Sequence, residues 1–245
     1  MQFIKTTSAI GICLLALGTA YAAGPQHTAP TAPANPNNAP AAETTGNAPA
    51  NKTSDAQGLV DQAVQVVNKM KSDPQLVNLM KKAKGLYIVP EFGRGAFIVG
   101  GRGGAGLVTI RQQNGTWSDP AFYDFGAISL GAQAGGSGGS VVFLLMDQSA
   151  VDAFKSGNKI SLNTGAGLSI VNYSANAQAS WGKGDIIMWS DTAGAYAGAT
   201  VSVTDINWAD GNNRQYYGKN VDMTKILNGT ATNASAAELK NALPG

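Results

Sequence analysis

The chain has 245 residues, of which 17 are lysine or arginine and 15 are aspartate or glutamate, so its formal net charge is +2. This balance argues against a general nucleic-acid binder. The single cysteine, Cys13, and the single histidine, His27, both lie near the N-terminus. The rest of the chain therefore lacks the side chains for thiol catalysis, for a Ser-His-Asp triad or for a zinc site with Cys or His ligands.

The N-terminus has the pattern of a secretory signal peptide. Residues 1–22 combine Lys5, an apolar stretch and a small-x-small sequence that ends at Ala22. The apolar stretch is too short to span a bilayer comfortably, and we expect no transmembrane helix in the mature chain. Residues 23–53 are rich in Pro, Ala, Asn and Thr and predict a disordered linker. We expect an exported protein, periplasmic or secreted, whose folded domain covers residues 54–245.

Two helices are expected at the start of this domain. Ser54 can cap the first, whose apolar residues recur every three or four positions from Leu59 to Met70. Asp73 can cap the second, with Pro74 at its first position. The stretch that follows these helices is basic, because between residues 69 and 111 only Asp73 and Glu91 offset eight cations: Lys69, Lys71, Lys81, Lys82, Lys84, Arg94, Arg102 and Arg111.

Short runs of Ile, Val, Phe and Tyr between glycines predict strands in the rest of the chain. We expect them at residues 86–89, 96–99, 107–110, 140–146, 160–162, 167–171, 175–181, 186–190 and 193–204, with 140–146 central. Residues 121–134, which follow Pro120, place apolar side chains among small residues and are assigned to no element type. A short helix opened by Ser149 should cover residues 147–156, a strand or loop should contain Tyr216 and Tyr217, and helical segments should cover 224–227 and 234–243. These elements predict an α+β fold, an antiparallel β-sandwich or barrel-like sheet with N-terminal helices and a short C-terminal helix.

One glycine motif has a functional and a structural interpretation. Gly101, Gly103 and Gly106 match G-x-G-x-x-G, which binds a dinucleotide when a helix begins at the third glycine. The β-branched residues after Gly106 predict a strand instead. We therefore expect these glycines to relieve crowding at bends of a sheet.

Other patterns argue weakly for catalysis or metal binding. Ser156 with Lys159, and Ser180 with Lys183, have the S-x-x-K spacing of acyl-transfer enzymes without its companion triplets. An oxygen-rich cluster misses the calcium-loop spacing and favours a turn: Asp205, Asn207, Asp210 and Asn212. We expect no enzymatic activity, no cofactor and no metal.

Three segments share their order and spacing with a known family: KAKGLYIVPEFGRGAFIVGGRGGAGLV, GTWSDPAFYDFGAISLGAQAGG and AYAGATVSVTDINWADGNNRQYYGKNVDMTKIL. Together they resemble the SYLF domain, from about residue 56 to the C-terminus. The resemblance implies lipid binding, to phosphoinositides in eukaryotic members, and binding to actin filaments in the fungal actin-patch proteins. It also implies an exported single-domain protein, the typical form of bacterial members.

From this resemblance and the signal peptide we expect binding to anionic lipid at an envelope membrane surface, with actin a partner only by family analogy. Lysines can contact lipid phosphates, and the candidates are Lys69, Lys71, Lys81, Lys82, Lys84, Arg94 and Arg102. The alternative is a structural protein that binds cell-envelope glycan or protein. A glycan-binding face would use the aromatic residues of the C-terminal half: Trp181, Trp189, Trp208, Tyr216 and Tyr217.

Overall fold

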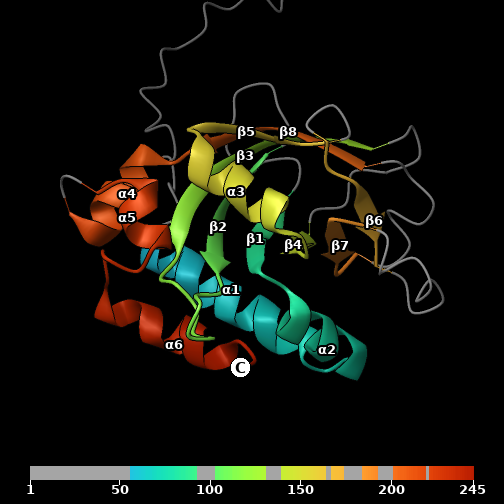
Figure 1. The fold of residues 1–245 in the computed structure, drawn as a ribbon, viewed down its shortest axis with the longest axis horizontal. Helices are drawn as coiled ribbons and strands as arrows, with labels where there is room; N and C mark the ends of the chain where they lie inside the picture. The colour runs from blue at the N-terminus through green and yellow to red at the C-terminus, as the bar shows by residue number, and fades with distance from the viewer. Residues whose placement is uncertain are drawn as a thin grey trace, which may run out of the picture. The chain divides into compact units, whose positions relative to one another are not determined.

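A curled, mostly antiparallel sheet forms the centre of the structure, a computed structural model (Figure 1). The structure describes residues 56–92, 103–130, 139–163, 167–173, 184–192, 201–218 and 221–245. The predicted signal peptide, linker and strands at 96–99 and 175–181 lie outside these ranges. Among the described residues the fold is α+β, with N-terminal helices and a short C-terminal helix, as predicted.

The two predicted N-terminal helices are present. Helix α1 (Ala56–Met70) buries its apolar positions from Leu59 to Met70. Helix α2 (Pro74–Lys82) begins where the Asp73 carboxylate accepts a hydrogen bond from the Gln75 N–H at 2.8 Å. The carboxylate accepts from a backbone N–H that has no acceptor within the first turn of the helix. Proline is well tolerated at this first position, because the N–H that it lacks would have had no partner in the helix.

Among the described residues, eight strands form the sheet, in the order β5-β8-β3-β2-β1-β4-β7-β6. The ends of the sheet curl toward each other, because β6 contacts β8 although they lie near opposite ends of this order. Strand β6 pairs with β7 in parallel, so the predicted antiparallel pattern fails at this edge. The strands are β1 (Gly85–Phe92), β2 (Gly104–Ile110), β3 (Ala121–Leu130), β4 (Gly139–Leu145), β5 (Lys159–Leu162), β6 (Ile170–Asn172), β7 (Ile186–Ser190) and β8 (Val201–Trp208).

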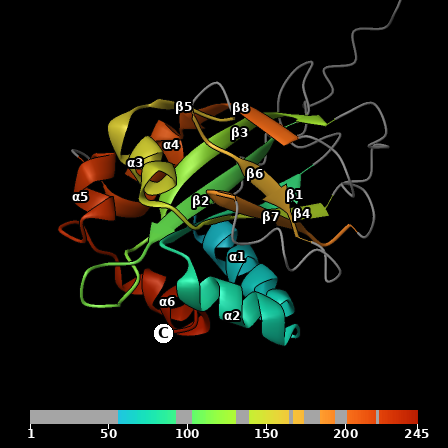
Figure 2. The same cartoon turned by 45° about the vertical axis from the view of Figure 1, so that its right-hand side comes forward.

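The central strands are buried on both faces, and alternate residues enter two different cores. In β1, Tyr87 and Val89 lie in one core, while Leu86 and Ile88 lie in the other. Successive side chains point to opposite faces of a strand, which explains why β1 and β4 each contain a continuous apolar run, at residues 86–89 and 141–145. Helices α1, α2 and α6 (Ala237–Ala242) cover one face of the sheet, and α3 (Gln148–Ser156) and α5 (Met223–Leu227) lie on the other (Figures 1 and 2).

Two local predictions were wrong. Helix α3 is capped by Asp147, whose carboxylate accepts from the Ser149 N–H at 2.9 Å, so Ser149 lies inside the helix that it was expected to open. Tyr216 and Tyr217 belong to helix α4 (Asp210–Tyr217), not to a strand or loop. The buried Asn213 anchors α4 by donating to the backbone oxygens of Phe122 and Ala209 and by accepting from the Phe122 N–H.

Candidate anion-binding surface and cleft

The outer face of α2 carries two lysines of the predicted basic site. Leu76, Leu79 and Met80 are buried against the sheet, which leaves Lys81 and Lys82 exposed in the last turn. In the part of the chain that the structure describes, neither lysine forms an ion pair, and α2 contains no acidic residue. Cations at a helix C-terminus complement the helix dipole, so their positions are also favourable for the helix itself.

Lys84 lies where α2 leads into β1. Its N–H donates to the Leu145 oxygen and its own carbonyl accepts from the Arg111 N–H, both at 2.8 Å, so the backbone here belongs to the sheet. The side chain is exposed. The pKa of Asp147 is lowered mainly by hydrogen bonds from Ser149, with a smaller contribution from the charge of Lys84.

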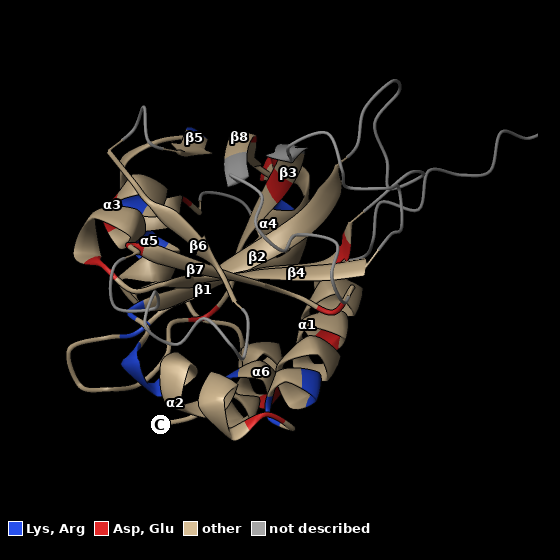
Figure 3. Ribbon diagram, turned by 90° about the vertical axis from the view of Figure 1, so that its right-hand side faces the viewer, with Lys and Arg blue, Asp and Glu red and all other residues tan. Residues whose placement is uncertain are grey.

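The other predicted cations differ from these three. Lys69 forms an ion pair with Asp191 at 3.0 Å, and Lys71 donates to the Ala242 carbonyl at 3.0 Å. Burial acts to raise the pKa of Asp191, but hydrogen bonds from Lys69 and Ser140 outweigh it and hold that pKa below its ordinary value. Arg94 and Arg102 lie outside the described residues. Figure 3 shows lysine and arginine on several elements rather than on one face.

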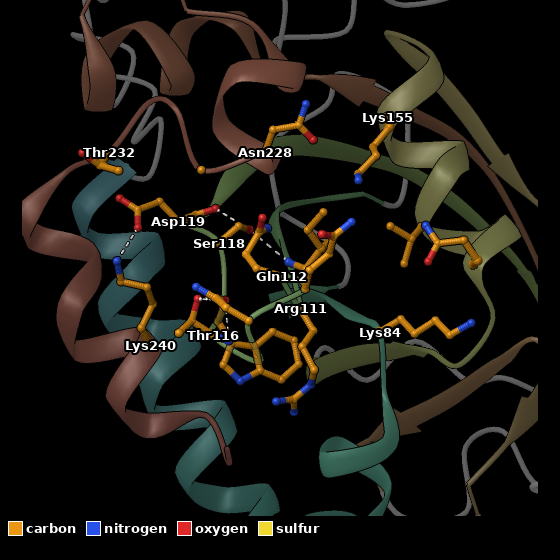
Figure 4. Close-up of a pocket in the computed structure, with 17 residues that line it drawn as sticks. Lys84, Arg111, Gln112, Thr116, Ser118, Asp119, Lys155, Asn228, Thr232 and Lys240 are labelled. Atoms are coloured by element: carbon orange, nitrogen blue, oxygen red, sulfur yellow. Dashed lines mark hydrogen bonds and ion pairs between the residues drawn. The ribbon is translucent and has the colours of Figure 1, made fainter.

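A polar cleft of about 790 Å³ opens beside Lys84. Its walls come from the β2–β3 hairpin (residues 110–119), from α3, from the segment after α5 and from α6 (Figure 4). Four cations line the cleft, Lys84, Arg111, Lys155 and Lys240, against one carboxylate, Asp119. The cleft therefore carries an excess of positive charge. Of these four residues, only Lys84 was among the site residues predicted from the sequence.

Arg111 holds the walls together rather than facing the cleft. Its guanidinium donates to the carbonyls of Gly115 and Pro244, both at 3.1 Å, and more weakly to Met80 and Ala83 at the end of α2. Figure 4 shows the guanidinium turned away from Lys155. Burial lowers the pKa of this guanidinium, although an arginine stays charged in proteins.

Asp119 and Lys240 form the second fixed wall. The Asp119 carboxylate is buried, and it accepts from the Lys240 Nζ and from the Asn233 N–H, each at 2.6 Å. The pair thus ties the β2–β3 hairpin to the C-terminal helical segment. The charge of Lys240 is neutralised by this contact, which leaves Lys84 and Lys155 as the cations that a ligand in the cleft could reach.

The aromatic residues of the alternative glycan site do not form an exposed face. Trp189 and Tyr216 are buried, and Trp208 packs against the core on the α3 side of the sheet. The Tyr217 hydroxyl donates to the Pro120 carbonyl at 2.7 Å, which uses its polar end inside the protein. Trp181 lies outside the described residues.

Several described residues of the candidate catalytic and metal-binding patterns contact residues outside their own pattern. Ser156 donates to the Ala153 carbonyl at 3.2 Å, whereas Lys159 pairs with Asp205 at 2.8 Å. Asp210 pairs with Arg214 within α4. Ser180 and Lys183 lie outside the described residues. No group of three or more His, Cys, Asp or Glu side chains suited to a metal ion occurs within the described ranges.

Comparison with known proteins identifies a family to which part of the chain is similar. Residues 126–244 match the model of the Ysc84 family, described as "Las17-binding protein actin regulator". The chain carries a domain of the Ysc84 (SYLF) family. The family resemblance seen in the sequence is therefore confirmed. The family description names a binding protein and regulator and no reaction, which fits a non-enzymatic role.

Individual relatives are similar over about two thirds of this chain. The LAS seventeen-binding protein 3 of Saccharomyces cerevisiae is 35% identical over 162 residues, which cover 62% of this chain and 34% of the relative. Protein YSC84 of the same yeast is 31% identical over 165 residues, covering 65% and 35%. The human SH3 domain-containing YSC84-like protein 1 is 26% identical over 164 residues, covering 66% and 48%. The chain thus spans between a third and a half of these relatives.

The length and composition of the helices bear on whether one of them could span a membrane. Of those in the described ranges, none combines the length and the apolar composition that a bilayer-spanning helix needs.

Proposed function

We propose that this Ysc84 domain binds anionic lipid surfaces without catalysis, and that the outer face of α2 makes the contact. The observation that carries the proposal is the exposed pair Lys81 and Lys82, which lacks any ion-pair partner among the residues described. An unpaired lysine keeps its full charge available for a lipid phosphate. Lys84 follows this pair two residues later, after the helix has ended, and is also exposed.

The contact is peripheral rather than inserted. The apolar residues of α1 are buried in the core, so this helix has no apolar face left for the membrane interface. Each lysine near an anionic surface contributes about 1 kcal/mol, so three lysines support weak, reversible and salt-sensitive binding. Arg94 and Arg102 would add to it. With the predicted signal peptide, the membrane in question is one of the cell envelope, reached from the periplasm or from outside.

A protein partner is the second candidate. The family description and the name of the yeast relative both refer to binding of Las17, and the family is described as an actin regulator. The same lysines could attract an acidic protein surface, and actin filaments are the available probe. Co-sedimentation with filaments that is lost in the Lys81→Gln/Lys82→Gln variant would support this candidate.

Co-sedimentation with vesicles tests the lipid proposal. The probes are phosphatidylcholine vesicles with and without phosphatidylglycerol, at low and high salt. Lys81→Gln/Lys82→Gln should lose most of the binding to anionic vesicles, whereas Lys159→Gln/Lys225→Gln should keep it. The second variant removes the same charge from lysines that are already paired, with Asp205 and Asp222. Equal losses in the two variants, or binding to neutral vesicles, would contradict a specific role for α2.

A further inference from the structure

The cleft beside the β2–β3 hairpin is lined mostly by polar and charged side chains, and Lys81 and Lys82 of α2 are not among them. We propose that it binds a small, hydroxyl-rich anion, of the class of sugar phosphates and sugar acids. The proposal does not rest on lipid binding by Lys81 and Lys82, because neither lysine lines the cleft, and only Lys84 belongs to both surfaces.

Two cations of the cleft remain available to an anion. Arg111 donates to main-chain carbonyls, and Lys240 is paired with Asp119. Lys84 and Lys155 form no ion pair with any described residue, and they approach the cleft from different elements. Figure 4 shows Lys155 extending from α3 toward the hairpin. The single carboxylate that lines the cleft, Asp119, is already neutralised, so nothing in the wall repels an anion.

The remaining polar groups suit hydroxyls. The side chains of Gln113, Asn228 and Thr232 line the cleft, are exposed and have no hydrogen-bond partner within the described part of the chain. Gln112 donates its amide to the Leu227 carbonyl at 2.8 Å, which leaves its oxygen as an acceptor. Carboxamides and hydroxyls both donate and accept, as sugar hydroxyls do, so they can pair with either end of a hydroxyl group.

The apolar part of the lining argues against a lipid tail. It consists of Ile110, Val151 and Trp117, and all three are buried, with Trp117 the most exposed at 6%. An acyl chain would therefore find polar walls and lose its contact with other apolar groups. A cleft of about 790 Å³ has room for one or two sugar rings.

The cleft is built on fixed elements. Arg111 ties the hairpin to the ends of α2 and of the chain, and Asp119 ties it to α6. After α5, Gly229 adopts a left-handed backbone with φ 75°, which turns the chain toward the cleft, and its N–H donates to the Ile226 carbonyl at 2.9 Å. Walls that are ordered before binding lower the entropy cost of holding a small ligand.

Isothermal titration calorimetry with glucose 6-phosphate, glucuronate, glucose and inorganic phosphate tests the proposal on the purified chain. The two anionic sugars should bind at least tenfold more tightly than glucose or phosphate. Lys155→Gln should weaken glucose 6-phosphate about tenfold, because it removes a charge-assisted hydrogen bond. Asn228→Ala should weaken it less, and Lys225→Gln, outside the cleft, should not change it. Absence of saturable binding, phosphate binding as tight as the sugar phosphate, or unchanged affinity in Lys155→Gln would overturn the assignment.

Vesicle binding by the same variants separates this site from the surface of α2. Lys155→Gln should bind phosphatidylglycerol vesicles like the wild type, and Lys81→Gln/Lys82→Gln should bind glucose 6-phosphate like the wild type. Parallel loss of vesicle binding in Lys155→Gln would assign the cleft to a lipid head group and overturn the soluble sugar as its ligand. If neither the wild type nor any variant binds vesicles, the proposed lipid surface of α2 is wrong. The calorimetric titrations then decide the cleft proposal by themselves.

Discussion

The guanidinium of Arg111 lies over the ring of Trp117, with its central carbon 4.3 Å from the ring centroid. The Trp117 Nε1 and the Arg111 Nη2 both donate to the carbonyl of Pro244, at 3.0 and 3.1 Å. The two residues face each other across the start and end of the β2–β3 hairpin, where they also form an isolated bridge. This stack therefore connects the hairpin, the C-terminal end of α2 and the last residues of the chain.

Loss of the stack should destabilise the whole domain. Arg111→Lys keeps the charge but loses the planar fork that reaches several carbonyls at once, so we expect a loss of about 2 kcal/mol in unfolding free energy. Urea unfolding followed by circular dichroism measures it. Lys155→Arg, at a half-buried lysine without an ion pair among the described residues, is the matched control and should change stability by less than about 0.5 kcal/mol. A stability loss no larger than that of the control would show that the stack has no structural role.

Gly106 tests the structural interpretation of the G-x-G-x-x-G motif. A Cβ atom at Gly106 would lie 2.9 Å from both the Ile88 carbonyl oxygen and the Tyr87 ring. Gly106→Ala should therefore cost about 2 kcal/mol or more through overpacking, measured by the urea midpoint. In Gly211→Ala, where no atom lies within 4 Å, stability should stay unchanged or rise. Equal behaviour of the two variants would refute the crowding argument.

Asn213 is predicted to be one of the most sensitive polar residues. Its side chain is fully buried and satisfies the Phe122 N–H at 3.0 Å while donating to two carbonyls at 2.8 and 2.9 Å. Asn213→Ala should cost about 2–3 kcal/mol, because it leaves a buried N–H unpaired and opens a small cavity. Thermal unfolding checks this. Asn78→Ala, on the exposed face of α2, should have no measurable cost, and a similar loss in both would contradict the prediction.

Acid should weaken the contact between Asp73 and Tyr173. The hydrogen bond from the Tyr173 hydroxyl is the largest influence on Asp73, and the bond from Gln75 adds to it, so the pKa of Asp73 lies below its ordinary value of 3.8. A lowered folded-state pKa gives stability that is present above pH 3.8 and is lost as the pH falls through the lowered value. Tyr173→Phe should therefore be less stable than the wild type at pH 7, and this difference should shrink below pH 3.8. A difference that stays constant from pH 7 to pH 2 would contradict the assignment.

The local patterns predicted most of the fold. The spacing of apolar residues located α1, and the Asp73-Pro74 pair located the start of α2, because both signals act within a few residues. The continuous apolar run of β4 indicated a central strand. The parallel pairing of β6 could not be predicted, because register between distant segments depends on the curl of the whole sheet.

The candidate site was less accessible to sequence reasoning. The basic stretch suggested a single surface, but Lys69 meets Asp191, a residue 122 positions away in the chain. The cleft likewise combines Lys84 with Lys155 and Asn228, which no local pattern links. Asn213 was missed because its partner Phe122 is 91 residues distant. Asn residues next to Asp favour a turn by composition alone. Only the tertiary structure shows that Asn212 and Asn213 are both buried.

The most direct test of the account is an environment-sensitive dye on the outer face of α2. Asn78→Cys places the label beside Lys81 and Lys82 in a Cys13→Ser background, since Cys13 is the only native cysteine. Thr224→Cys places it on α5, on the opposite side of the sheet. With phosphatidylglycerol vesicles, the emission of the label at residue 78 should shift to the blue and return in high salt, while the label at residue 224 stays unchanged. No shift at residue 78, or the same shift at both positions, would contradict membrane contact through α2.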